Sequence, residues 1–261
     1  MKRTAKKILL SDYPEHFHAL LSGAEIFDSS CSPEARVIMI DREGGCFLKS
    51  APAGALAREA ELDAYFHQKG LSAPVLDYCT VGERDWLLTA RVRGEDLTHR
   101  TYLEDPRRLA ILLGERLRAL HETACGDCPV KERMKEYFAT AEENYRRGVC
   151  DPSFYADYGN ADADELYAIV EANRDALSTD VLLHGDYCLP NILFENWRFS
   201  GFIDLGNGGI GNRHIDLYWG AWTLRFNLGT DDFRALFLDA YGRDRIEPDA
   251  LRTVAAAECF A

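Results

Sequence analysis

The 21 residues from His184 to Asp204 constrain this chain more than any other part of its sequence. Short apolar runs lie in and beside this stretch, and such runs are typical of buried strands that carry polar residues at their ends. The runs are Val181-Leu182-Leu183, Ile192-Leu193-Phe194 and Phe199-Ser200-Gly201-Phe202-Ile203. Asp186, Asn191 and Asp204 stand in the turns that these runs enter or leave, so we expect the three side chains to belong to one site.

Asp186, Asn191 and Asp204 are the residue types that phosphoryl transfer requires. Asp186 precedes Asn191 by five positions, and Asp204 follows 13 positions later. In enzymes of that class one carboxylate orients and deprotonates a hydroxyl group, while an amide oxygen and a second carboxylate hold Mg²⁺ on the nucleotide phosphates. A single Asp or Asn in such a place is usually a turn or helix-start residue. The combination predicts Asp186 as the base and the other two residues as metal ligands.

The order of the expected elements predicts an α+β protein. Before residue 93 we expect strands over 36–40, 46–49, 75–80 and 86–90 and one helix over 55–69. After it we expect helices over 106–122, 130–147, 162–173, 214–226, 230–241 and 248–260, and a long irregular loop over 148–160. This order is typical of a bilobal protein-kinase-like fold. We predict a small antiparallel-sheet nucleotide-binding lobe (1–92) and a larger, mainly helical catalytic and substrate-binding lobe (93–261).

The expected small lobe also contains candidates for nucleotide contacts. Lys49 ends a strand, as a lysine that holds the α- and β-phosphates should, and Glu59 on the next helix can pair with it. Glu61 competes for that role, but Glu59 lies nearer the apolar face of the helix. Ala90 and Val92, at the expected hinge, offer backbone groups to adenine. The chain contains no GxGxxG loop.

Charge narrows the range of partners. The net charge of −13 is divided unevenly, because residues 1–92 carry 11 Lys+Arg against 13 Asp+Glu, whereas residues 93–261 carry 19 against 30. Nucleic acid needs clustered cations and is disfavoured as a partner. An acidic field attracts a cationic substrate, or it simply keeps the protein in solution, and charge alone leaves both explanations open. No apolar run reaches the roughly 18 residues of a membrane span or forms a signal peptide, so the expected location is the cytoplasm.

Eight cysteines are scattered along the chain, and we expect them to be reduced thiols. Cys125 and Cys128 form a CxxC pair. A zinc site usually requires a second pair of ligands at suitable spacing, and the sequence near this pair supplies none. A redox or metal protein built on the cysteines is therefore disfavoured.

Taken together, these motifs resemble the aminoglycoside phosphotransferase family, in particular its 3′-phosphotransferase branch, over nearly the whole chain. The main carriers are His184-Gly185-Asp186, Leu189-Pro190-Asn191-Ile192 and Arg198-Phe199-Ser200-Gly201-Phe202-Ile203-Asp204-Leu205-Gly206. Supporting carriers are Arg84-Asp85-Trp86-Leu87-Leu88, Gly94-Glu95-Asp96-Leu97, Arg118-Ala119-Leu120-His121 and Glu165-Leu166-Tyr167. Ser32-Pro33 matches the nucleotide-positioning loop of the family.

The resemblance implies a kinase-like fold and transfer of the ATP γ-phosphate to a sugar 3′-hydroxyl. By position, it implies Asp186 as the catalytic base and Asn191 and Asp204 as Mg²⁺ ligands. The implied nucleotide contacts are Lys49, Glu59, Ser32, Ala90 and Val92. An enzyme of this kind confers resistance to the antibiotic that it modifies.

The departures from the family pattern concern the substrate. Asn207 stands where the family commonly has Arg, and Phe226 replaces an expected acid; Asp157 and Glu258 match acids that the family offers to its cationic substrate. Ala261 follows the aromatic residue at which the family chain ends. These departures keep open a kinase for another small amino-sugar or amino-alcohol metabolite. A pseudokinase scaffold is a further alternative, although retention of all the catalytic residue types argues against it.

Overall fold

The computed structural model describes residues 4–31, 35–179 and 181–261. Contacts between Cα atoms divide the chain into two compact units. The first comprises the described residues up to His99 together with Pro190–Gly206, and the second comprises Arg100–Leu189 and Asn207–Ala261. The first unit is therefore built from two separate stretches of sequence.

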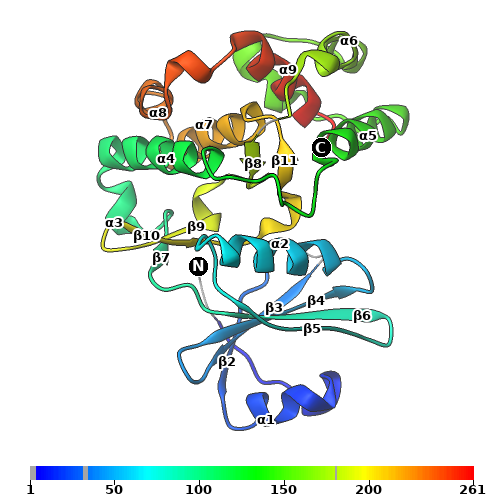
Figure 1. The fold of residues 1–261 in the computed structure, drawn as a ribbon, viewed down its shortest axis with the longest axis vertical. Helices are drawn as coiled ribbons and strands as arrows, with labels where there is room; N and C mark the ends of the chain where they lie inside the picture. Colours follow the sequence, from blue (N-terminus) through cyan, green and yellow to red (C-terminus); the bar gives the residue numbers. More distant parts are fainter. Residues whose placement is uncertain (1–3, 32–34, 180) are drawn as a thin grey trace. The chain divides into compact units, whose positions relative to one another are not determined.

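The first unit is centred on a six-stranded antiparallel sheet in the order β1-β2-β3-β4-β6-β5 (Figure 1). The strands are β1 (Thr4–Ala5), β2 (Glu25–Asp28), β3 (Arg36–Asp41), β4 (Cys46–Pro52), β5 (Val75–Val81) and β6 (Arg84–Ala90). Strands β3 and β4 form a hairpin around Gly44 and Gly45, which both have positive φ angles. Glycine adopts such angles without the steric penalty of a Cβ atom.

The alternation of side chains along the strands gives this sheet two covered faces. Trp86 and Leu88 of β6 pack on one face with residues of the N-terminal segment, among them Phe17 and Leu21. That segment contains the 3₁₀ helices Leu10–Asp12 and Glu15–Phe17 and helix α1 (His18–Leu21). Leu87 points to the opposite face, where it packs with Leu56 and Ala60 beside helix α2 (Ala57–Gln68). Figure 1 shows α1 and α2 on opposite faces of the sheet.

A second, three-stranded sheet completes the first unit in the order β10-β9-β7. Its strands are β7 (Glu95–Asp96), β9 (Ile192–Glu195) and β10 (Arg198–Phe202). Gly94, at φ +88°, lets the backbone approach this hairpin, because a Cβ atom there would lie 2.1 Å from the carbonyl oxygen of Phe194. The β9–β10 hairpin carries Asn191 before its first strand and Asp204 shortly after its second.

The second unit is mainly helical. Its helices are α3 (Arg100–Leu103), α4 (Pro106–His121), α5 (Arg133–Arg146), α6 (Ala163–Asn173), α7 (His214–Leu228), α8 (Arg234–Tyr241) and α9 (Pro248–Glu258). The strands β8 (Val181–Leu183) and β11 (Gly209–Gly211) pair antiparallel between them. Helix α4 begins with Asp105 as N-cap and Pro106 in its first turn, two signals that favour a helix start.

These elements confirm the predicted α+β class, with an N-terminal antiparallel sheet followed by a mainly helical region. The prediction of an irregular loop over 148–160 was wrong in part, because Pro152–Tyr158 forms a 3₁₀ helix. The side chain of Asp151 caps its start, and Tyr155 is buried in the core of the second unit. Within the described residues, no helix is long and apolar enough to cross a membrane.

Candidate active site

Lys49, Glu59 and Asp204 form one charged cluster in the first unit. Lys49 lies on β4, and its Nζ atom donates to both carboxylate oxygens of Glu59, at 2.7 and 2.8 Å. The same nitrogen donates to Oδ1 of Asp204 at 3.1 Å. Lys49 is one position from Leu48, whose side chain faces the N-terminal segment, so alternation turns Lys49 toward the α2 side. Glu59, rather than the exposed Glu61, is the partner.

The cluster fixes the charge of Lys49. Burial disfavours the ammonium form, but the carboxylates of Asp204 and Glu59 outweigh it, and the pKa of Lys49 is raised. Burial also raises the pKa of Glu59, with Lys49 opposing this shift and Asp204 adding to it. A lysine that stays protonated and partly buried next to two carboxylates is suited to hold phosphate oxygens.

The backbone of Asp204 is in the left-handed region, at φ 57°. Aspartate enters this region more readily than most residues, but the conformation still costs on the order of 1 kcal/mol and is concentrated at functional sites. The turn directs a half-exposed carboxylate toward Lys49. Asn191 lies across the same hairpin end, because its carbonyl oxygen accepts the N–H of Ile203 at 3.0 Å. The structure thus brings the two predicted metal ligands to one end of the β9–β10 hairpin.

Asp63 is a further carboxyl group near this cluster that sequence reasoning missed. It lies on α2, four residues after Glu59 and on the same side of the helix, and it is buried. Burial raises the pKa of Asp63 well above its usual value, and the nearby charges of Glu59 and Asp204 raise it further. The available signal was its i+4 spacing from Glu59, but spacing alone could not reveal its burial.

Replacing Asp63 with asparagine is expected to stabilise the protein, and more so at pH 8 than at pH 5. A carboxyl group with a raised pKa destabilises the folded state as pH rises above the unfolded value of about 3.9. Each unit of that shift corresponds to about 1.4 kcal/mol. Urea denaturation at both pH values measures the effect. Glu61→Gln, on the exposed side of the same helix, is the control and should change stability by less than about 0.5 kcal/mol. A less stable Asp63→Asn protein at pH 8 would contradict the expectation.

Asp186 belongs to the second unit, in the loop that follows β8. Its N–H donates to Nδ1 of His184 at 3.3 Å, and its carbonyl oxygen accepts the N–H of Cys188 at 2.8 Å. These local bonds hold a partly exposed aspartate in a loop whose other residues are buried. Burial raises the pKa of the Cys188 thiol, and Asp186 adds to this shift, so the thiol stays neutral beside the carboxylate.

Asp216, at the start of α7, holds this loop by hydrogen bonds to its backbone. It is fully buried, and its Oδ2 and Oδ1 atoms accept the N–H groups of His184 and Gly185, each at 2.8 Å. Nε2 of His121, at the end of α4, lies 3.2 Å from Oδ2 of Asp216. Two helices therefore converge on the loop that carries Asp186. The contact between Asp216 and His121 joins residues 95 positions apart in the chain, so it could not be predicted from the sequence.

Gly185 and Asn207 pack tightly in the second unit. Gly185 has φ +82°, and a Cβ atom there would lie 1.9 Å from the backbone oxygen of Asn207. The same oxygen accepts a hydrogen bond from Nε of Arg133 at 2.8 Å. The backbone of Asn207 thus has a structural role here, whatever its side chain contributes to substrate binding.

The two predicted adenine contacts, Ala90 and Val92, lie at the end of β6 and just beyond it. The N–H of Ala90 already donates to the carbonyl oxygen of Pro74 at 3.0 Å, so its carbonyl oxygen is the backbone group that it can offer. Val92 is buried beside Gly201 of the hairpin. Ser32, the remaining predicted nucleotide contact, lies outside the described residues.

Asp157 has two internal partners. Its carboxylate accepts hydrogen bonds from Arg225 and Arg234, one on each oxygen. Burial opposes its ionisation, but Arg234 and Arg225 outweigh this effect and lower its pKa. The negative charge of Asp157 is therefore neutralised by two guanidinium groups.

Glu258 and Phe226 have opposite environments. Glu258 is buried near the end of α9, where it accepts a hydrogen bond from Tyr137 at 2.8 Å. Burial raises the pKa of Glu258 to about 7, and the charge of Asp186 contributes to the rise.

Phe226 is 70% exposed, and its ring stacks on Trp222 with centroids 4.9 Å apart. Phe226 therefore presents an uncharged aromatic ring to solvent.

Residues 26–254 match the model of the phosphotransferase enzyme family. The chain belongs to this family. It is 45% identical over 254 residues, 97% of each chain, to a probable aminoglycoside 3′-phosphotransferase of Lactococcus lactis subsp. lactis (strain IL1403). Its structure is similar to the crystal structure of an aminoglycoside 3′-phosphotransferase of type VIII, with a TM-score of 0.72, 25% identity and 96% of each chain covered.

A phosphotransferase family member from Streptomyces rimosus, solved in complex with ADP and streptomycin, is also similar. The TM-score is 0.70 at 25% identity, and the match covers 86% of this chain and 90% of that one. The resemblance inferred from the motifs is confirmed by these matches. The individual roles of the site residues remain predictions, which the placement of Lys49, Glu59 and Asp204 supports.

Proposed function

We infer that this phosphotransferase transfers the γ-phosphate of ATP to the 3′-hydroxyl of an aminoglycoside and thereby confers resistance to it. The observation that carries this inference is the Lys49–Glu59–Asp204 cluster in a chain 45% identical, over nearly its whole length, to a probable aminoglycoside 3′-phosphotransferase. Retention of the charged cluster supports an active enzyme over a pseudokinase scaffold.

The proposed nucleotide-binding lobe is 1–92, and residues of the β9–β10 hairpin add to it. Lys49 binds the α- and β-phosphates, and Glu59 holds its ammonium group in place. The carbonyl of Ala90 and the N–H of Val92 bind adenine, and Ser32 is a further proposed contact of the nucleotide. The ammonium group of Lys49 donates a hydrogen bond to Asp204 in this structure. Bound phosphate oxygens would therefore compete with the Asp204 carboxylate for the N–H groups of Lys49.

The hairpin end fits a magnesium ion. Mg²⁺ takes oxygen ligands, and the side chains of Asn191 and Asp204 supply an amide oxygen and a carboxylate from neighbouring backbone positions. When bound, the ion neutralises charge on the β- and γ-phosphate oxygens. Asn191 and Asp204 would hold it, while Lys49 contributes positive charge from the protein.

Asp186 acts as the catalytic base in the proposed second lobe, 93–261. It accepts a hydrogen bond from the substrate hydroxyl and orients that oxygen toward the γ-phosphate. Because the transition state is loose, the proton passes to Asp186 late in the reaction. The Asp216 carboxylate maintains the loop geometry that this role requires.

Substrate recognition uses the acidic character of this lobe. The ammonium groups of an aminoglycoside are attracted to carboxylates, and Glu258, with a pKa of about 7, ionises fully when a cation approaches it. Asp157 contributes less charge because Arg225 and Arg234 neutralise it. Phe226 and Asn207 complete the proposed substrate contacts, the first through its exposed ring.

A coupled ADP-release assay tests the function and the position of transfer together. With Mg·ATP, we expect ADP release to depend on kanamycin, and an aminoglycoside that lacks the 3′-hydroxyl to give none. Release of ADP with streptomycin alone would assign the 3″-position, since the Streptomyces rimosus relative was solved with that compound. Stimulation by an amino-sugar or amino-alcohol metabolite, and by no aminoglycoside, would replace the proposal with a metabolite kinase.

A further inference from the structure

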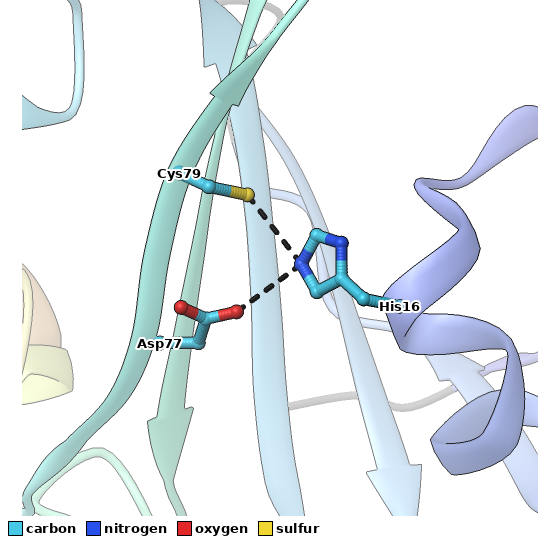
Figure 2. A group of neighbouring side chains, drawn as sticks. All are labelled: His16, Asp77 and Cys79. Carbon is cyan, nitrogen blue, oxygen red and sulfur yellow. Dashed lines mark hydrogen bonds and ion pairs between the residues drawn. The ribbon is translucent and has the colours of Figure 1, made fainter.

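His16, Asp77 and Cys79 meet on the face of the six-stranded sheet that the N-terminal segment covers, opposite to the face toward which Lys49 points (Figure 2). His16 comes from the 3₁₀ helix Glu15–Phe17, and the other two come from β5. Nε2 of His16 lies 3.1 Å from Oδ2 of Asp77 and 3.5 Å from Sγ of Cys79. One ring nitrogen therefore faces both a carboxylate oxygen and a sulfur atom.

The strand register and the packing of the N-terminal segment bring these three side chains together. Asp77 and Cys79 lie opposite Leu88 and Trp86 of β6, so both point to the face that the N-terminal segment covers. Tyr78, between them, points to the other face and donates to Asp85. His16 is placed over β5 by its neighbour Phe17, which is buried against Trp86. The three side chains thus converge because of packing in the surrounding core.

We propose that His16, Asp77 and Cys79 form a binding site for zinc. Cys79 would supply a thiolate, His16 its Nε2 atom and Asp77 one oxygen, with water as the fourth ligand. Zinc bond lengths of about 2.0 Å to nitrogen and oxygen and about 2.3 Å to sulfur place tetrahedral ligands about 3.3 Å (N to O) and about 3.5 Å (N to S) apart. The separations in the structure, 3.1 and 3.5 Å, agree with this geometry.

The donor set selects the metal. Sulfur and imidazole nitrogen favour zinc, whereas Mg²⁺ favours the oxygen donors that Asn191 and Asp204 provide. The site is open to solvent, since the side chains of His16 and Asp77 are 46% and 40% exposed, so an ion and a water ligand can enter. Binding through a thiolate would release the proton of the Cys79 thiol to solvent.

Zinc at this site would join the N-terminal segment to the edge strand of the sheet. His16 and Asp77 are 61 residues apart in sequence, and β5 is the last strand in the sheet order. An ion that bridges them binds the folded state and stabilises it by mass action. The predicted consequence is a metal-dependent stability of the first unit.

Cobalt(II) titration of the full-length, EDTA-treated protein tests the site. We expect one equivalent to give a thiolate-to-cobalt charge-transfer band and the visible bands of tetrahedral Co²⁺, which one equivalent of Zn²⁺ removes. His16→Gln and Cys79→Ser should each weaken binding at least about tenfold, and Cys79→Ser should abolish the charge-transfer band. Zn²⁺ should raise the Tm of the unmutated protein and leave the Tm of either variant nearly unchanged.

Two cysteine variants outside the proposed site serve as matched controls. Cys31→Ser, which removes an exposed thiol, should leave the bands intact. Cys125→Ser should do the same, and loss of the bands in that variant would move the site to the Cys125–Cys128 pair and overturn the proposal. Absence of saturable one-to-one binding, or equal binding by His16→Gln and the unmutated protein, would also overturn it. If Cys79→Ser does not fold, His16→Gln still tests the site, because the half-exposed histidine side chain can be replaced without disturbing the core.

Discussion

Replacing Asp186 with alanine is expected to lower kcat by about 10²–10⁴-fold, the usual contribution of a general base. The proposed base would orient the substrate hydroxyl and accept its proton, whereas the charged cluster that we propose binds ATP belongs to the other unit. ATP affinity, measured by calorimetric titration, should therefore change by less than about threefold, a shift of under 1 kcal/mol. Asp186→Asn preserves the shape of the side chain and should lose nearly as much activity.

Asp232→Asn is the matched control for these variants. Asp232 is an exposed aspartate of the same unit, and its replacement should leave kcat and KM unaltered. A kcat for Asp186→Ala within tenfold of the unmutated enzyme would remove Asp186 from the role of base. Loss of ATP binding in that variant would instead indicate damage beyond the loop.

Replacing Asp216 with alanine is expected to destabilise the protein by about 2–6 kcal/mol, because each of two buried N–H groups that loses its acceptor costs about 1–3 kcal/mol. The buried carboxylate accepts the N–H groups of His184 and Gly185 and contacts His121. Alanine leaves these polar groups without their acceptor in a site that water does not reach. Denaturant unfolding measures the loss, and where the variant is too unstable, Asp216→Asn retains one acceptor oxygen.

The same replacement should lower kcat while leaving KM for ATP nearly constant, because Asp216 positions the loop that carries Asp186. Val170→Ala is a suitable comparison, since it removes buried apolar volume from the same unit without contacting that loop. Its kcat per folded molecule should be unchanged. Equal losses of kcat in the two variants would show that Asp216 contributes stability alone.

Local patterns in the sequence predicted which neighbouring residues of the candidate site lie together. The face of α2 identified Glu59 over Glu61 as the partner of Lys49, because helical periodicity determines which side chain turns inward. The apolar runs around Asn191 and Asp204 likewise became the paired strands of one hairpin.

Long-range side-chain partners could not be predicted in the same way. The neutralisation of Asp157 requires Arg225 and Arg234, which are 68 and 77 residues away in sequence. The buried Glu258 accepts a hydrogen bond from Tyr137, which is 121 residues away. The sequence predicts Asp157 and Glu258 as substrate contacts because both are acids. The structure shows that neighbouring groups change how much negative charge each of them offers.

The discontinuous first unit has a consequence for synthesis of the chain. The β9–β10 hairpin, with Asn191 and Asp204, joins a unit whose main sheet is complete by Ala90. A ribosome that has finished this sheet must add about 100 more residues before the hairpin emerges, which takes roughly 5–20 s at bacterial and eukaryotic elongation rates. During this time β7, which pairs with β9 in the three-stranded sheet, has no partner strand. A fragment that ends at His99 would lack both proposed magnesium ligands, so the first unit cannot be transplanted as one contiguous piece of gene.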